Sequence, residues 1–219
     1  RWQYYGVSLP FWRSYDKEDP RREFFYYDYT GDAKRDDQSD YGFHYMVPEE
    51  GVTVVPNDTT KYMQNVATMK YTYDMISDAY YDGRTICIFR LSDVILCKAE
   101  IENNLNGPAA ALPYLNQIRA RAGAPEYGKH NRFPAPSTKE TMNDAILKER
   151  GYELVFEFQR RADLIRFGKY EEVVNAHLKK LGIAQPTNVT SSLRYFPYPL
   201  NDAQLNPNLA AENPSRLPK

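Results

Sequence analysis

The fold of this chain is decided by residues 91–108, which read LSDVILCKAEIENNLNGP. Apolar side chains recur there at spacings of three and four, at Leu91, Val94, Ile95, Ala99, Ile101 and Leu105. This period predicts a helix with one apolar stripe. Asn106-Gly107-Pro108 then ends the helix and begins another.

The stretch that follows carries a second apolar face, at Leu112, Leu115, Ile118 and Ala122, and stops at Gly123. Two helices joined by so short a turn pack antiparallel. We therefore predict a tetratricopeptide-like hairpin from helices at about 90–105 and 109–122. Pro113 removes one backbone donor near the start of the second helix.

Three more helical segments follow the hairpin. Ser137-x-x-Glu140 has the form of a capping box, which predicts the start of a third helix. That helix carries Ile146, Leu147, Arg150, Leu154 and Phe158. A short piece over 162–167 ends at Gly168, and a last helix over about 170–181 ends at Gly182.

These patterns divide the chain into three parts. Residues 1–85 are irregular and aromatic-rich, with a candidate strand over 24–29, a polar loop over 31–40 and a β-like run over 52–55. Residues 86–182 are the helical core. Residues 183–219 are rich in Pro and Asn, which favours an extended segment. The predicted fold is mainly α, with tetratricopeptide-like hairpins, long irregular loops and minor β structure.

Composition excludes several classes of function. The 219 residues include 28 Lys and Arg against 29 Asp and Glu, so the net charge is −1. This balance argues against general nucleic-acid binding, which needs a surplus of cations. Two cysteines make no disulfide framework. We expect Cys97 to be a free thiol on the apolar side of its helix; a disulfide with Cys87 or a metal site is the alternative.

Three carboxylates recur every four residues, at Glu149, Glu153 and Glu157. A helical di-metal site would also need Glu-x-x-His pairs. The only histidines are His44, His130 and His177. Because arginines surround the glutamates, we predict that Glu149 or Glu153 pairs with an arginine of a neighbouring helix and binds no metal.

No other motif indicates catalysis or a cofactor. The acidic run Asp36–Asp40 lacks the Gly and Glu that a calcium loop places at its sixth and twelfth positions. The chain has no GxGxxG, Walker, HExxH or GxSxG motif. We expect no cofactor, metal or catalytic residue, although a spatial pair of carboxylates would leave no sequence signature.

Aromatic residues gather at the start of the chain. Eleven of the 31 lie in the first 30 positions, and both tryptophans are among them. Such rings stack on sugar rings or peptide side chains while their polar edges stay hydrated. The candidate ligand-binding residues are Trp2, Tyr4, Tyr5 and Trp12, with Arg13 as a hydrogen-bond donor. The alternative is an aromatic core beneath long loops.

Five short elements occur in a characteristic order. They are RLSDVILCKAE at 90–100, LNQIRARAG at 115–123, KER and ELxxE between 148 and 157, RADLIRFG at 161–168, and FPYP at 196–199 with NPNL at 206–209. In this order and spacing they resemble the SusD/RagB family over about residues 90–214. Looser echoes lie at Asp19-Pro20-Arg21 and Lys70-Tyr71. Bidentate pairing between helices gives the charged residues of these motifs a structural role. These residues are Arg119, Arg121, Glu149, Arg150, Glu153, Asp163 and Arg166.

The resemblance implies a function. Members are surface lipoproteins of the Gram-negative outer membrane that bind a nutrient and close as a lid over a TonB-dependent transporter of the SusC type. The nutrient is most often a glycan and sometimes a peptide, and the proteins are not enzymes. Members are much longer than 219 residues, so this chain resembles the C-terminal half, with the lipid anchor outside it. A glycan-active hydrolase and a helical-repeat scaffold that binds only proteins are the alternatives.

Overall fold

The computed structural model describes the backbone of residues 7–26, 28–34, 40–46, 65–68, 70, 87–180, 189–190, 196, 198–206 and 208. The chain forms two compact units, Arg1–Glu157 and Phe158–Lys219. The two units divide between Glu157 and Phe158, inside the helical stretch predicted at 86–182. The boundary between compact units therefore differs from the boundaries that we drew from sequence patterns.

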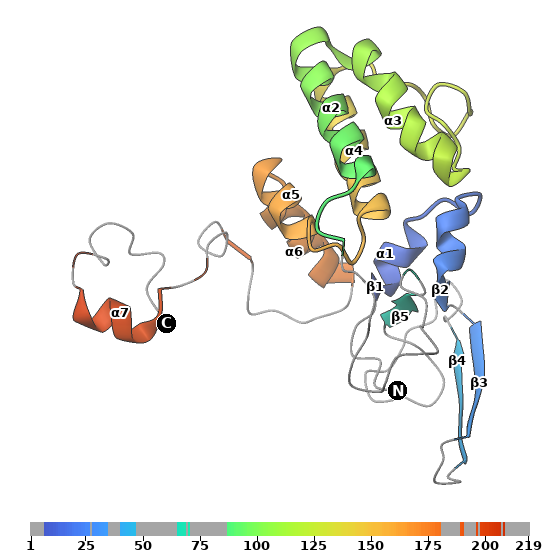
Figure 1. Cartoon of the computed structure of the whole chain (residues 1–219), viewed down its shortest axis with the longest axis vertical. Coiled ribbons are helices and arrows are strands. Elements are labelled where there is room, and N and C mark those ends of the chain that lie inside the picture. The colour runs from blue at the N-terminus through green and yellow to red at the C-terminus, as the bar shows by residue number, and fades with distance from the viewer. Residues whose placement is uncertain are drawn as a thin grey trace. The chain divides into compact units, whose positions relative to one another are not determined.

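The first unit is built on a helical hairpin (Figure 1). Helix α2 spans Leu91–Asn106 and helix α3 spans Pro108–Ala122. Only Gly107 separates them, with a φ of 88° that favours glycine, and Pro108 occupies the first position of α3. The predicted antiparallel hairpin is confirmed. Both helices pack against α4, Lys139–Glu153.

The predicted apolar stripe of α2 is mostly not buried, and Ala99 is its one buried member. The buried residues are Ser92, Asp93, Leu96, Ala99 and Asn103. Four of the predicted stripe are exposed: Leu91, Val94, Ile101 and Leu105. Polar contacts to α4 decide this orientation. Asp93 pairs with Arg150 at 2.7 Å, and Asn103 donates to the Lys139 carbonyl at 2.8 Å.

Helix α3 follows its sequence pattern more closely. Leu115 and Ile118 are buried as predicted, and exposed Pro113 is accommodated inside the helix. Gly123 ends the helix in the left-handed conformation, with a φ of 72°. Its N–H donates to the Ala120 carbonyl, which satisfies one of the last carbonyls of the helix.

Helix α4 differs from its prediction at both ends. Its capping box joins Thr138 and Thr141 rather than Ser137 and Glu140, one residue later than predicted. The helix ends at Glu153, whereas the sequence pattern continued to Phe158. A turn follows over 154–158. Phe156 and Phe158 both have a φ of 62° there, which an α-helix does not allow.

Short strands and helices form the N-terminal part of the first unit. Strand β1 (Val7–Ser8) and β2 (Phe25–Tyr26) pair antiparallel with β5 (Asn65–Thr68), and α1 (Leu9–Arg13) and the 3-10 helix η1 (Pro20–Phe24) lie between β1 and β2 in the chain. Strands β3 (Asp28–Lys34) and β4 (Asp40–Met46) form a separate hairpin.

Two sequence predictions for this part need correction. The candidate strand over 24–29 is divided between β2 and β3. The polar loop predicted over 31–40 is strand at both ends, because β3 runs to Lys34 and β4 begins at Asp40. Antiparallel pairing with β4 satisfies the backbone of a stretch whose composition is typical of a loop. The β-like run at 52–55 lies outside the described residues.

Aromatic residues build the core of this part. A cluster of buried side chains contains Val7, Trp12, Tyr15, Phe25 and Tyr152. The first four come from the N-terminal segment, whereas Tyr152 comes from the last turn of α4. The cluster therefore packs the N-terminal segment against α4.

The second unit contains α5 (Arg160–Arg166), α6 (Tyr170–Lys180) and α7 (Leu200–Leu205). The first two are confirmed within two residues of their predicted bounds. Gly168 follows α5 with a φ of 68°, as the predicted end requires, whereas Gly182 lies outside the described residues. Arg161 lies over the rings of Tyr170 and Phe196, at 5.5 and 4.8 Å from their centroids.

The fold class is confirmed as mainly helical with minor β structure. Among the helices of the described ranges, none combines the length and apolar content needed to cross a bilayer. Cys87 and Cys97 are both free thiols. Cys97 is half-buried beside the Asp93–Arg150 pair, with its Sγ 3.7 Å from Arg150 Nη1, so its predicted apolar surroundings are wrong.

Candidate functional site

A buried network of ion pairs lies beneath the candidate site. Its three acids are Glu149 and Glu153 of α4 and Glu157 of the following turn, and all three are buried. Glu149 accepts hydrogen bonds from Arg119 Nη1 of α3 at 2.7 Å and from Arg21 Nη1 at 2.6 Å. The predicted pairing with an arginine of a neighbouring helix is therefore confirmed.

Glu153 is the centre of this network. It accepts hydrogen bonds from Arg21 Nη1 at 3.0 Å, Arg90 Nη1 at 2.6 Å and Arg121 Nη2 at 2.7 Å. Burial by itself would raise the pKa of Glu153, but the hydrogen bonds and charge of Arg90, with the charge of Arg121, lower it to about 2. Glu153 is thus held as a carboxylate and has no proton to give near neutral pH.

Glu157 completes the network by pairing with Arg90, which it shares with Glu153, and with Lys70. Arg90 Nε lies 2.8 Å from its Oε2, and the Lys70 ammonium contacts its Oε1. Lys70 Nζ also donates to the carbonyls of Glu153 and Val155, at 2.8 and 2.9 Å. Burial lowers the pKa of Lys70, although Glu157 opposes that shift. The lysine therefore fixes the turn that ends α4.

The described residues contain no group of three or more His, Cys, Asp or Glu side chains arranged to hold a metal ion. Each acid of the network instead accepts hydrogen bonds from at least two cations, which accounts for its burial without a metal.

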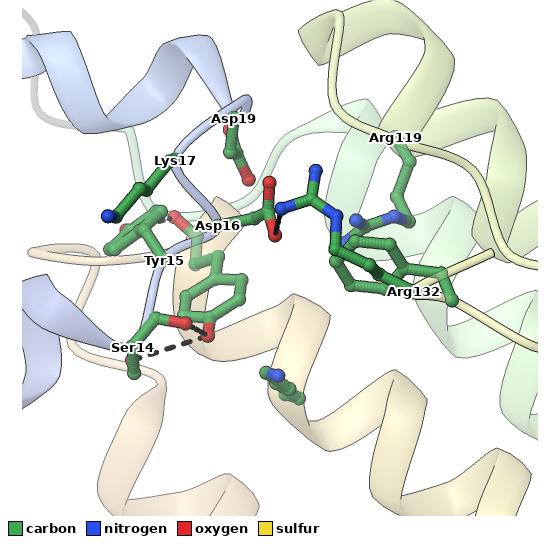
Figure 2. A pocket seen from close by; sticks show the side chains of 10 residues that line it. Ser14, Tyr15, Asp16, Lys17, Asp19, Arg119 and Arg132 are labelled. Carbon is green, nitrogen blue, oxygen red and sulfur yellow. Dashed lines mark hydrogen bonds and ion pairs between the residues drawn. The ribbon is translucent and has the colours of Figure 1, made fainter. Parts of the chain in front are cut away.

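An open pocket of about 380 Å³ lies beside the network (Figure 2). Three parts of the chain form it: the segment from Ser14 to Asp19, the end of α3 with the loop after it, and α4. Its lining residues are Ser14, Tyr15, Asp16, Lys17, Asp19, Arg119, Arg132, Phe133, Lys148 and Tyr152.

Two stacked tyrosines form part of its wall. The rings of Tyr15 and Tyr152 have centroids 4.2 Å apart and planes inclined by 28°. Tyr15 Oη donates to the Tyr152 carbonyl at 3.0 Å, and Tyr152 Oη contacts the Ser14 carbonyl. Burial raises the pKa of Tyr152 to about 12 and that of Tyr15 further. Both hydroxyls are therefore protonated structural donors.

Charged side chains occupy the rim. Arg132 pairs with Asp16 at 3.1 Å (Figure 2). It also pairs with Glu18 at 2.6 Å. Lys17 and Lys148 are exposed and make no ion pair with the described residues. Four cations line the pocket against two carboxylates, so its lining is positive.

Arg119 is the buried cation of the lining. Only 2% of its surface is exposed, and its guanidinium lies over the rings of Tyr127 and Phe133. Nε donates to the Pro125 carbonyl at 2.5 Å and Nη1 to Glu149. Nη2 is buried and has no acceptor among the described residues.

The structure describes two of the predicted ligand-binding residues, Trp12 and Arg13. Trp2, Tyr4 and Tyr5 lie outside the described residues. Trp12 is 5% exposed within the aromatic core, its Nε1 donates to the Arg22 carbonyl at 3.4 Å, and Arg22 covers its ring at 4.0 Å. Its burial supports the alternative interpretation of a core residue for this one ring. Arg13 is half-buried at the end of α1 and does not line the pocket.

The pocket residues were not predicted from the sequence. Tyr15 belonged to the aromatic group of the N-terminal segment and Lys148 to the KER element at 148–150, but neither was predicted to line a pocket. Lys17 and Arg132 belonged to no motif. Up to 138 positions separate the residues whose side chains line the pocket, so local spacing gave no signal. The weak resemblance at Asp19-Pro20-Arg21 was the available indication, because Asp19 lines this pocket and Arg21 joins the ion-pair network.

Comparison with known proteins identifies the family of this chain. The model of the SusD family matches residues 8–215. The chain belongs to the SusD family. This match extends the resemblance, seen in sequence from about residue 90, to the N-terminal segment that supplies Asp19, Arg21 and Lys70.

Individual SusD proteins are similar over parts of the chain. A SusD-like protein of Formosa agariphila is 39% identical over 120 residues, which are 55% of this chain and 22% of that protein. The starch-binding protein SusD of Bacteroides thetaiotaomicron is 28% identical over 137 residues, 62% of this chain and 22% of that one. The matched part is thus about a fifth of these curated relatives.

A solved structure also resembles the chain. The crystal structure of a SusD superfamily protein from Bacteroides vulgatus matches 90% of this chain and 40% of its own, with a TM-score of 0.57 and 25% identity. The backbone similarity therefore covers most of this chain and less than half of that protein.

Proposed function

We propose that this chain belongs to a surface-exposed nutrient-binding protein that binds glycans without altering them. The observation that carries the proposal is the SusD family match over residues 8–215, in a family whose members include a starch-binding protein. The protein acts as the lid of a TonB-dependent SusC-like transporter, on the extracellular face of the outer membrane. A lipid anchor attaches it there.

The state of the acids supports binding rather than hydrolysis. A glycosidase needs one carboxyl group that donates a proton and a second that acts as base or nucleophile. Glu149, Glu153 and Glu157 are buried and hydrogen-bonded to Arg or Lys, and the pKa of Glu153 is about 2. Carboxylates in this state maintain the packing of α4 and are poor proton donors.

The test is a panel of polysaccharides run with the full 219-residue chain in affinity gel electrophoresis, with product analysis of the same mixtures. We expect retarded migration with at least one glycan and no new reducing ends. New reducing ends would establish the hydrolase instead. Binding of peptides with no binding of any glycan would favour the peptide-binding alternative.

Trp2, Tyr4 and Tyr5 remain proposed ligand contacts, and Arg13 remains a proposed hydrogen-bond donor to the ligand. Trp2→Ala should weaken glycan binding while the circular dichroism spectrum stays unchanged. A W2A variant with unaltered affinity and an intact fold would remove Trp2 from the site.

The transporter partnership has its own test. The tagged protein should co-purify from outer membranes with a large β-barrel protein whose sequence identifies it as SusC-like. Recovery without such a barrel, under conditions that retain the lipid-anchored protein, would favour a scaffold that binds other proteins.

A further inference from the structure

The pocket between the Ser14–Asp19 segment, the end of α3 and α4 has the chemistry of an anion site. Six of its ten lining side chains carry charge, and four of these are cations. Asp16 is paired with Arg132, and Asp19 is paired with Arg21 at 2.7 Å. Both carboxylates are therefore already neutralised by an arginine.

The two lysines of the pocket have no such partner. Lys17 comes from the N-terminal segment and Lys148 from α4, and both are exposed. Neither forms an ion pair with the described residues, and the nearest charge–ring contact is Lys148 Nζ at 5.8 Å from the Tyr152 centroid. Two ammonium groups of one pocket thus keep their charge available to a ligand.

A buried donor lies in the same wall. Arg119 extends from α3 toward the pocket (Figure 2), and its Nη2 has no acceptor although the side chain is almost fully buried. An unpaired buried donor costs about 1–3 kcal/mol, and more when it is charged. A negative charge in the pocket would offset part of this cost by Coulomb attraction to the guanidinium beneath it.

The size and surface of the pocket restrict what it accepts. A volume of about 380 Å³ holds one or two sugar units rather than a folded partner. Phe133 is half-buried at the pocket and presents an apolar surface next to the cations. This combination suits a sugar ring that carries a charged substituent.

We propose that this pocket is a subsite for a carboxylate or sulfate group carried by a glycan, with Lys17 and Lys148 as its direct ligands. The assignment rests on the proposed function, since it names the class of glycan that the protein prefers. Arg132 stays paired with Asp16 and Glu18 and shapes the rim. Arg119 contributes positive potential from beneath.

The experiment measures binding by isothermal titration calorimetry with the full chain and four probes. These are trigalacturonate, a sulfated carrageenan tetrasaccharide, neutral maltotriose and triglutamate. We expect one of the two acidic sugars to bind at least about tenfold more tightly than maltotriose, with an affinity that falls as salt rises. The tighter of the two identifies the anionic group as carboxylate or sulfate.

Variants assign the effect to this pocket. Lys17→Gln and Lys148→Gln should each weaken the preferred acidic sugar about tenfold, because each removes a hydrogen bond to a charged group. Lys179→Gln makes the same change of charge on the exposed surface of α6 and should have no effect. The lysines are exposed, so circular dichroism should show all three variants folded.

The outcomes separate this inference from the proposed function. Equal binding of maltotriose and the acidic sugars, or unchanged affinity in both lysine variants, would overturn the anion subsite while leaving glycan binding intact. Equal binding of triglutamate would overturn the assignment to a glycan. A chain that binds none of the three sugars overturns the anion subsite, whereas the proposed function is decided by the polysaccharide panel.

Discussion

Arg21 of the N-terminal segment donates a hydrogen bond to Glu149 of α4 over 2.6 Å, across 128 positions of sequence. The same guanidinium pairs with Asp19 and with Glu153. Because these side chains are buried, removal of one partner leaves the other charges without compensation. The network therefore joins the N-terminal segment to the helices, and its disruption should weaken the whole first unit.

Glu153→Gln tests this role. Breaking a buried ion pair by removing one partner costs about 3–5 kcal/mol. We expect the free energy of unfolding, measured in urea, to fall by about that amount, because Arg21, Arg90 and Arg121 all lose a charged acceptor. Glu126→Gln is the matched control, since Glu126 pairs with the exposed Lys129 and should cost about 0–1 kcal/mol. Equal losses in the two variants would contradict a stabilising network.

The same residue predicts a dependence on pH. The pKa of Glu153 is about 2 in the folded chain, against 4.5 for an ordinary glutamate. The folded state thus binds this proton less tightly than the unfolded state. The resulting stability is present above pH 4.5 and is lost as the pH falls toward about 2.

Urea unfolding at a series of pH values in that window measures the effect. E153Q has no such group, so its stability should fall less steeply than that of the unchanged protein as the pH decreases. Parallel curves for the two proteins would show that Glu153 does not carry the shift.

Sequence predicted the helices well and the buried face of α2 poorly. Gly107-Pro108 and Gly123 fix where α2 ends and where α3 begins and ends, because glycine and proline act through local backbone geometry. The buried side of α2 depends instead on Arg150, more than 40 positions away, which pairs with Asp93. Local periodicity carries no information on that contact.

The pocket was beyond sequence reasoning for the same reason. Aromatic density located Tyr15 in the right segment, but no sequence feature singled out Lys17, and the KER element that contains Lys148 indicated no pocket. Only the fold brings the two sides of the pocket together. Trp12 was predicted as a ligand contact because aromatic residues are dense in the N-terminal segment. The structure places its ring in the core with Tyr15 and Phe25.

Trp12→Ala should therefore unfold the N-terminal part of the chain. Truncating a buried aromatic residue costs about 3–5 kcal/mol. Thermal unfolding followed by circular dichroism should show a large drop in the transition temperature. Phe24→Ala, an aromatic truncation at a side chain that is 55% exposed, should shift it much less. A W12A variant as stable as F24A would contradict the burial of the ring.

The orientation of α2 can be tested in the same way. Leu96 is fully buried against its neighbours, whereas Ile101 is 56% exposed. Leu96→Ala should cost about 2–5 kcal/mol in urea unfolding. Ile101→Gln should stay within about 0.5 kcal/mol, as surface substitutions usually do. The opposite ranking would restore the apolar stripe that periodicity predicted.

Gly123 joins the end of α3 to the N-terminal segment by a close approach. Its φ is 72°, and a Cβ at this position would lie 3.2 Å from Pro20 Cγ, where the neighbour must move. Gly123→Ala thus combines two penalties. The left-handed conformation costs about 1–2 kcal/mol for a residue with a Cβ, and the contact with the proline ring adds to it.

A double-mutant cycle with Pro20→Ala separates the two, because alanine lacks the Cγ atom that the new Cβ would meet. We expect G123A to cost about 1–2 kcal/mol in the P20A background and at least about 0.5 kcal/mol more in the unchanged chain. Urea unfolding of the four proteins gives the coupling energy directly. Equal costs in both backgrounds would mean that Pro20 does not pack against the end of α3. In that case the ion-pair network and the aromatic core would have to hold the N-terminal segment against the helices on their own.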